Sequence, residues 1–133
     1  MPARTQIEAY SPKTLTREWG EEVFIAETPH YLGKILRMKA GTRGGLQYHV
    51  EKDETFHLVS GRAWVRGVNV LGELVVWMMY PGQSYRIPPG AVHQTEAIED
   101  CVFFEASTPH YDDRVRCEKD YGMPEGGGLP TTR

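Results

Sequence analysis

The chain has 133 residues, 15 basic and 18 acidic side chains, and a formal net charge of −3 at pH 7. This length is that of one domain, and the absence of a basic excess excludes a nucleic-acid binder that relies on phosphate contacts. The hydrophobic fraction of 40% suits a packed globular domain rather than a disordered chain. No apolar run reaches the length of a membrane span and the N-terminus has no secretory signal, so we expect a cytoplasmic protein without a membrane partner.

Glycine (14) and proline (9) are frequent, which predicts many tight turns and therefore many short strands. Runs of β-branched and aromatic residues alternate with these turns about every ten residues, a spacing typical of an all-β sandwich or barrel. The expected strands are residues 23–27, 31–39, 46–50, 54–59, 63–68, 73–80, 84–87, 92–97 and 101–106.

The two ends of the chain lack this pattern. We expect residues 1–18 to form an N-terminal arm that can pair as a strand with a partner, and residues 123–133 to form a flexible tail. The barrel domain then covers residues 19–122, with a charged surface segment and a weak helical option at residues 112–121. Cys101 and Cys117 do not form a C-x-x-C pair and are expected to be reduced.

Two histidines, a glutamate and a glutamine have the spacing of a metal site. Gln47 and His49 are two residues apart, so they share one face of a strand. Glu54 begins the next strand, and His93 follows the turn at residues 88–90. Imidazole nitrogens together with carboxylate and amide oxygens form a donor set for a divalent ion.

Alternation separates inward from outward side chains on these strands. Counting from Glu54, His57 points outward, and we exclude it from the metal set. On the strand at 31–39, Arg37 and Lys39 share the face opposite Lys34, so at most one of these sets points inward.

The spacing of these residues resembles the two signature motifs of the cupin superfamily. Two positions depart from the general pattern, because Gln47 replaces the usual first histidine and Ala97 the usual final asparagine. The matching positions of the first motif are Gly41, His49, Glu54 and Gly61, and those of the second are Gly82, Pro88, Gly90 and His93.

Residues 45–54 are also similar to the cupin domain of mannose-6-phosphate isomerases, including the bacterial forms fused to mannose-1-phosphate guanylyltransferase. That group carries Gln-x-His and a basic residue two positions before the glutamate, here Lys52. Segments 17–20, 84–90 and 112–122 resemble further parts of the domain. The resemblance implies a single-domain cupin, a double-stranded β-helix or jelly-roll barrel, with an N-terminal arm.

The resemblance also implies the site. One divalent transition ion (Zn, Mn, Fe or Ni) is expected, with four ligands: Gln47, His49, Glu54 and His93. Two basic residues are the catalytic candidates, Lys52 and Arg86. Three further residues are candidates for binding the substrate: Arg62, Tyr85 and Lys39.

Three functions remain open. The first is an isomerase or epimerase in which the ion polarises a carbonyl of a small anionic, sugar-like or sugar-phosphate-like substrate. The second is a non-haem iron dioxygenase, because His49, Glu54 and His93 alone make a set of two histidines and one carboxylate. The third is a module that binds sugar or metal without turnover. The sequence does not identify a proton shuttle, and a homodimer is expected from the resemblance and the arm.

Overall fold

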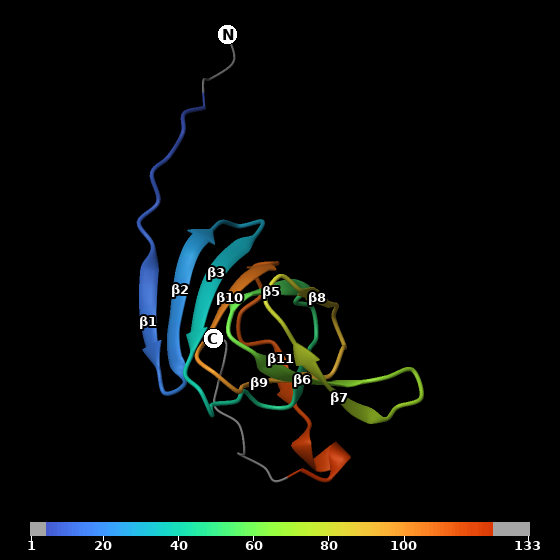
Figure 1. The fold of residues 1–133 in the computed structure, drawn as a ribbon. Helices are drawn as coiled ribbons and strands as arrows, with labels where there is room; N and C mark the ends of the chain where they lie inside the picture. Colours follow the sequence, from blue (N-terminus) through green and yellow to red (C-terminus); the bar gives the residue numbers. More distant parts are fainter. Residues whose placement is uncertain (1–4, 124–133) are drawn as a thin grey trace.

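The computed structural model describes residues 5–123, which form two antiparallel β-sheets that face each other (Figure 1). Sheet A has six strands in the order β1 (Lys13–Arg17), β2 (Gly20–Glu27), β3 (Leu32–Met38), β10 (Cys101–Ser107), β5 (Glu54–Ser60) and β8 (Ser84–Ile87). Sheet B has five in the order β11 (Arg114–Arg116), β4 (Gln47–His49), β9 (His93–Ala97), β6 (Ala63–Val68) and β7 (Leu74–Met79). The architecture is the expected jelly-roll barrel.

The core lies between the two sheets. Buried and partly exposed residues alternate along β5, β6 and β10, as expected for strands with one face inside a barrel. The inward residues of these strands and of their neighbours make one apolar cluster, which includes Trp19, Phe56, Leu58, Val65, Met79 and Phe103.

Each of the nine expected strands is present, with ends shifted by a few residues, and two further strands were not expected. One of them, β1, lies within the predicted arm and pairs with β2 of the same chain, Lys13 opposite Phe24. The arm was expected to pair with a partner, whereas residues 13–17 extend the chain's own sheet A. Gly20, at the start of β2, lets this strand approach β3 closely, because a Cβ atom there would lie 1.8 Å from the carbonyl oxygen of Arg37.

Residues 5–12 are exposed and extend away from the barrel (Figure 1). The homodimer that the arm suggested stays a prediction. Of the predicted tail, only Met123 belongs to the described part, and residues 124–133 lie outside it. Within residues 5–123, no helix is long and apolar enough to cross a membrane.

The other unexpected strand, β11, lies in the segment predicted to be on the surface. It pairs with β4, Arg114 opposite His49, and a short 3-10 helix, η1 (Glu118–Tyr121), follows it. The carboxylate of Glu118 accepts hydrogen bonds from Arg116 and from the backbone N–H of Leu46, at 3.3 Å. The C-terminal segment therefore supports the strand that carries Gln47 and His49. Cys101 and Cys117 are buried and free, as expected.

Candidate metal centre

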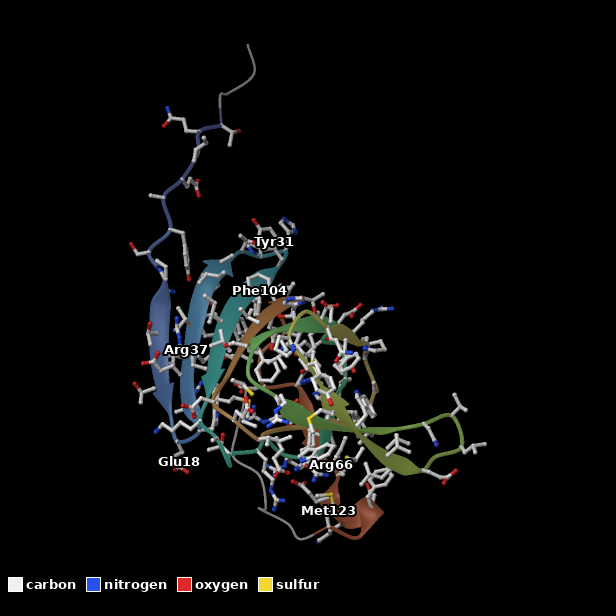
Figure 2. The ribbon with its side chains drawn as sticks, in the orientation of Figure 1. Glu18, Tyr31, Arg37, Arg66, Phe104 and Met123 are labelled. Carbon is white, nitrogen blue, oxygen red and sulfur yellow. The ribbon has the colours of Figure 1, made fainter. Side chains whose placement is uncertain are left out.

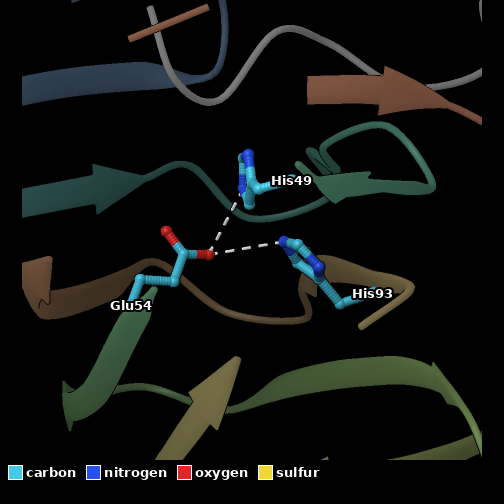
Figure 3. Close-up of side chains that lie close together, drawn as sticks. All are labelled: His49, Glu54 and His93. Atoms are coloured by element: carbon cyan, nitrogen blue, oxygen red, sulfur yellow. Dashed lines mark ion pairs between the residues drawn. The ribbon is translucent and has the colours of Figure 1, made fainter. Parts of the chain in front are cut away.

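Three ligand atoms from three strands converge inside the barrel (Figure 3). Oε1 of Glu54 lies 3.7 Å from Nε2 of His49 and 3.4 Å from Nε2 of His93, and the three atoms lie within 4.8 Å of one another. All three residues are buried. Among the residues that the structure describes, this is the one group of histidine, cysteine, aspartate or glutamate ligands with such geometry.

Short turns bring these strand ends together. The Gly90 N–H donates to the carbonyl oxygen of His49 at 2.8 Å, which ties the turn before His93 to the end of β4. The turn between His49 and Glu54 is fixed from the other side, because Asp53 N–H donates to the hydroxyl of Thr108 at 3.1 Å.

The partners of the two imidazoles assign their tautomers. Nδ1 of His93 lies 2.9 Å from the carbonyl oxygen of Ala91, which can only accept, so Nδ1 carries the proton. Nδ1 of His49 donates in the same way to Oδ1 of Asp113 at 3.1 Å. Both Nδ1 atoms are thus engaged and Nε2 of each ring is turned toward Glu54, the arrangement that metal-binding histidines adopt.

Asp113 is a structural anchor as well as a partner of His49. Its second oxygen accepts the backbone N–H groups of Glu51 and Lys52 at 2.8 and 2.9 Å. Burial alone would raise the pKa of Asp113, but these hydrogen bonds and His49 outweigh burial and hold the pKa below its ordinary value. Asp113 is therefore a carboxylate that orients His49.

Glu54 divides its two oxygens between two functions. Oε1 faces the histidines, while Oε2 lies 3.0 Å from Nζ of Lys52. Burial by itself would raise the pKa of Glu54, but Lys52, His49 and His93 outweigh it and hold the pKa well below its ordinary value. The residue is therefore ionised, as a metal ligand must be.

Gln47 lies beside this group. It is the pairing partner of His93 between β4 and β9, and its side chain is buried. It lines the same cavity as Glu54 and His93. The structure thus brings all four sequence-predicted ligands together, and their donor set fits a divalent transition ion.

The cavity beside these residues has a volume of about 50 Å³. Its polar wall includes Gln47, Glu54, His93 and Glu105, and its apolar wall is made by Leu36, Met38, Phe56 and Phe103. A cavity of this size has room for a few water molecules or a small ligand group.

A chain of buried charges leads away from the cavity. Nζ of Lys52 lies 3.1 Å from Oε2 of Glu105, which in turn lies 3.7 Å from Nζ of Lys34. Lys34 pairs with Glu22 at 2.9 Å, and Glu22 pairs with the partly exposed Arg17 at 3.1 Å. These residues, together with Glu54, form the buried charge chain, in which acids and bases alternate from the metal centre to the rim of sheet A.

Lys52 is therefore placed at the site, though not on a solvated turn. Burial would lower the pKa of Lys52, but Glu105 and Glu54 outweigh burial and raise the pKa above its ordinary value. A lysine that stays charged cannot accept a proton from a substrate. Its contacts make it a residue that positions the two carboxylates.

Three of the other candidates lie away from the cavity. Arg86 is exposed and forms an ion pair with Asp53 at 2.7 Å. Arg62 is exposed and pairs with Glu99, also at 2.7 Å. Lys39 follows β3 at an exposed position, because Lys34 occupies the inward face of that strand. Its neighbour Arg37 and the outward-facing Phe104 are exposed on the same sheet (Figure 2).

The last candidate, Tyr85, and the excluded His57 both lie outside the cavity. Tyr85 packs edge-on against Phe56 and Trp77, with ring centroids 6.0 and 5.7 Å apart, and does not line the cavity. His57 is not in the metal cluster, as expected, and its Nδ1 lies 2.7 Å from the hydroxyl of Ser84.

Glu105 and Asp113 were not identified from the sequence, and the alternation on residues 31–39 left open whether Lys34 points inward. Alternation could have found Glu105, because it is in phase with the apolar Cys101 and Phe103 on one strand. A charged residue at an inward position of a strand indicates a partner inside the barrel. No local signal identifies Asp113, whose contacts depend on the return of the C-terminal segment to β4.

No family model and no curated protein matches this sequence. Among solved structures, CapF, a capsular polysaccharide assembling protein from Staphylococcus aureus, is similar with a TM-score of 0.71 and 22% identity, over 81% of this chain and 32% of that chain. KdgF from Halomonas sp. has a TM-score of 0.61 and 23% identity, over 70% of this chain and 81% of that chain. A Bacillus subtilis oxalate decarboxylase described with Mn(II) centres has a TM-score of 0.64 and 18% identity, over 73% of this chain and 27% of that chain.

At these identities the likeness establishes the fold alone, which is the cupin fold. The chain spans about a third of the length of the CapF protein that it matches. The similarity to mannose-6-phosphate isomerases stays a prediction.

Proposed function

We propose that the protein is a metal-dependent cupin enzyme that holds one divalent transition ion with His49, Glu54 and His93, and with Gln47 as a fourth ligand. The observation that carries this proposal is the convergence of three ligand atoms within 4.8 Å. The hydrogen-bond partners of the two histidines turn both Nε2 atoms toward the same point. Four donors leave room in the coordination shell for a substrate oxygen or water.

The reaction we propose is an isomerisation or epimerisation, in which a proton moves at a carbon next to a carbonyl group. When bound, the ion supplies Lewis acidity that polarises such a carbonyl. The apolar wall formed by Leu36, Met38, Phe56 and Phe103 limits water and so strengthens electrostatic interactions inside the cavity.

The charges around the cavity favour a small substrate bound through its own oxygens. Lys52 is already balanced by two carboxylates, while Arg86 and Arg62 are exposed elsewhere. We therefore propose a small hydroxycarbonyl compound derived from a sugar, with any phosphate group outside the cavity. The likeness to a capsular polysaccharide assembling protein supports a sugar-derived substrate.

Exchange of hydrogen with solvent tests this proposal. The manganese-loaded protein is incubated in deuterated water with glyceraldehyde, mannose 6-phosphate and a panel of aldoses and ketoses, and proton NMR follows the C–H group next to the carbonyl. The proposal predicts loss of that signal for at least one compound. Absence of exchange across the panel, with one ion bound per chain, would show that the site does not catalyse this reaction.

A dioxygenase is the second candidate, because two histidines and one carboxylate beside an apolar wall suit iron(II) and oxygen. Substrate-dependent oxygen uptake by the iron-loaded protein, without hydrogen exchange, would favour it. Metal binding with neither activity would favour a non-catalytic binding module.

A further inference from the structure

We propose that Glu105 is the residue that accepts and returns the proton, an inference that rests on the proposed isomerase or epimerase function. Glu105 lies on β10, opposite Phe56 on β5 and Lys34 on β3, with its side chain inside the barrel. It is 3% exposed and lines the same cavity as Gln47 and His93.

A single ammonium group relates Glu105 to the metal centre. Nζ of Lys52 lies 3.0 Å from Glu54 and 3.1 Å from Glu105, so the two carboxylates lie within two ion-pair lengths of each other. A substrate oxygen beside Glu54 would therefore place the neighbouring carbon within reach of Glu105.

The other polar groups that line the cavity in the described part of the chain are unsuited to this role. Glu54 and His93 face the metal position with their ligand atoms. The amides of Gln47 and Gln94 and the hydroxyl of Thr95 do not accept protons at neutral pH. Gln94 also donates to the carbonyl oxygen of Gly44 at 2.9 Å. Glu105 is the lining carboxylate without a place among the metal ligands.

The isomerisation moves two protons, one from a carbon atom and one from a hydroxyl group, and the total charge is unchanged. The carboxylate of Glu105 takes the proton from the carbon next to the carbonyl, the C–H electron pair forms a C=C bond, and the carbonyl oxygen gains the negative charge. Glu105, now a neutral acid, returns the proton to the neighbouring carbon. The hydroxyl proton of the first carbon passes to the former carbonyl oxygen, and the electron pair of that O–H bond forms the new carbonyl. Before the step, Oε2 of Glu105 lies 3.1 Å from Nζ of Lys52 and 3.7 Å from Nζ of Lys34.

Glu22 offers a matched control, because it is a buried carboxylate on the same sheet and shares Lys34 with Glu105. Unlike Glu105, it does not line the cavity. If Glu105 only balanced the lysines, Glu105→Gln and Glu22→Gln would change the protein alike.

The test counts protons when acetohydroxamic acid binds to the manganese-loaded protein. This acid coordinates metals as its anion, so its proton goes either to a group in the site or to the buffer. Calorimetry in two buffers with different ionisation enthalpies measures the number released. Wild type and Glu22→Gln are expected to release almost none, while Glu105→Gln releases about one proton per site because the acceptor is gone. Glu105→Asp, which keeps the charge, is expected to restore proton capture.

The outcomes separate this inference from the proposed function. A wild-type chain that binds neither manganese nor acetohydroxamic acid would overturn the proposed function, and this inference with it. Intact metal binding with equal proton release from wild type and Glu105→Gln would overturn the role of Glu105 alone. If Glu105→Gln does not bind metal or does not fold, Glu105→Asp decides: proton capture as in wild type supports the role, and release to the buffer overturns it.

Discussion

Nζ of Lys52 lies 3.0 Å from Oε2 of Glu54, so the carboxylate that offers one oxygen to the metal site is held at its other oxygen by a buried ammonium group. The same Nζ lies 3.1 Å from Glu105. Lys52 is 1% exposed and stands between two acids that would otherwise repel each other inside the barrel. Lys52 therefore both stabilises the fold, by neutralising these two carboxylates, and fixes the position of Glu54 in the site.

We expect Lys52→Met to lower the free energy of unfolding of the metal-free protein by about 3–5 kcal/mol, because two buried carboxylates lose their shared cation. A divalent ion should recover part of this loss, since it neutralises Glu54. Urea unfolding with and without manganese measures both effects. Lys39→Met is the control and should change the unfolding free energy by less than about 0.5 kcal/mol, because Lys39 is exposed. Equal effects of the two substitutions would contradict the role of Lys52.

Asp113→Ala should weaken metal binding by about 10–100-fold, because His49 loses the carboxylate that fixes its ring and tautomer. Competition with a fluorescent metal chelator measures the affinity. Asp120→Ala, at an exposed position of η1, should bind the metal as wild type does. An unchanged affinity in Asp113→Ala would show that the hydrogen bond does not prepare His49 for the metal.

Glu118 should make a pH-dependent contribution to stability. Burial would raise the pKa of Glu118, but hydrogen bonds from Arg116 and the backbone N–H of Leu46 outweigh it and hold the pKa below its ordinary value. Because the pKa of Glu118 is lower in the folded chain, its carboxylate stabilises the fold fully at pH values above the pKa of the unfolded chain. This stabilisation is lost as the pH falls through the pKa of the folded chain.

Glu118→Gln should therefore lower the free energy of unfolding by about 1–3 kcal/mol at neutral pH. The difference from wild type should shrink below about pH 4, where the carboxyl group of the unfolded chain is protonated. Urea unfolding across this pH range is the measurement, with the exposed Asp120→Asn as control. A difference that stays constant down to low pH would contradict this assignment.

Arg86→Ala should leave metal affinity and hydrogen exchange unchanged, because Arg86 pairs with Asp53 on an exposed part of the molecule. The exchange assay with the manganese-loaded variant tests this. Lost exchange with intact metal binding would instead support the catalytic role that the sequence resemblance implied.

The barrel and the cluster of His49, Glu54 and His93 could be predicted from the sequence because both depend on local patterns. Turn glycines mark the strand ends, and alternation along β5 separates Glu54 and Phe56 from His57. Pairing across the barrel is not local, so β11 was not foreseen and the contact of Asp113 with His49 was not predicted.

The buried charged residues were also not predicted from the sequence. Lys34 and Glu105 lie at inward positions of their strands, where single-sequence reasoning expects apolar residues. The buried Lys34 and Lys52 are tolerated because each forms an ion pair with a glutamate, Glu22 and Glu105 respectively. Such pairs become visible only when the strand order is known, which explains why Lys39 rather than Lys34 was assigned to the substrate.

Titration of the metal-free protein with manganese by calorimetry tests the central claim most directly. We expect one ion bound per chain for wild type and for His57→Ala, whose side chain lies outside the cluster. We expect an affinity lower by more than about 100-fold when His49 and His93 are both replaced by alanine, because two of the proposed ligands are gone. A wild-type chain that binds no ion, or a double variant that binds as tightly as wild type, would contradict this claim.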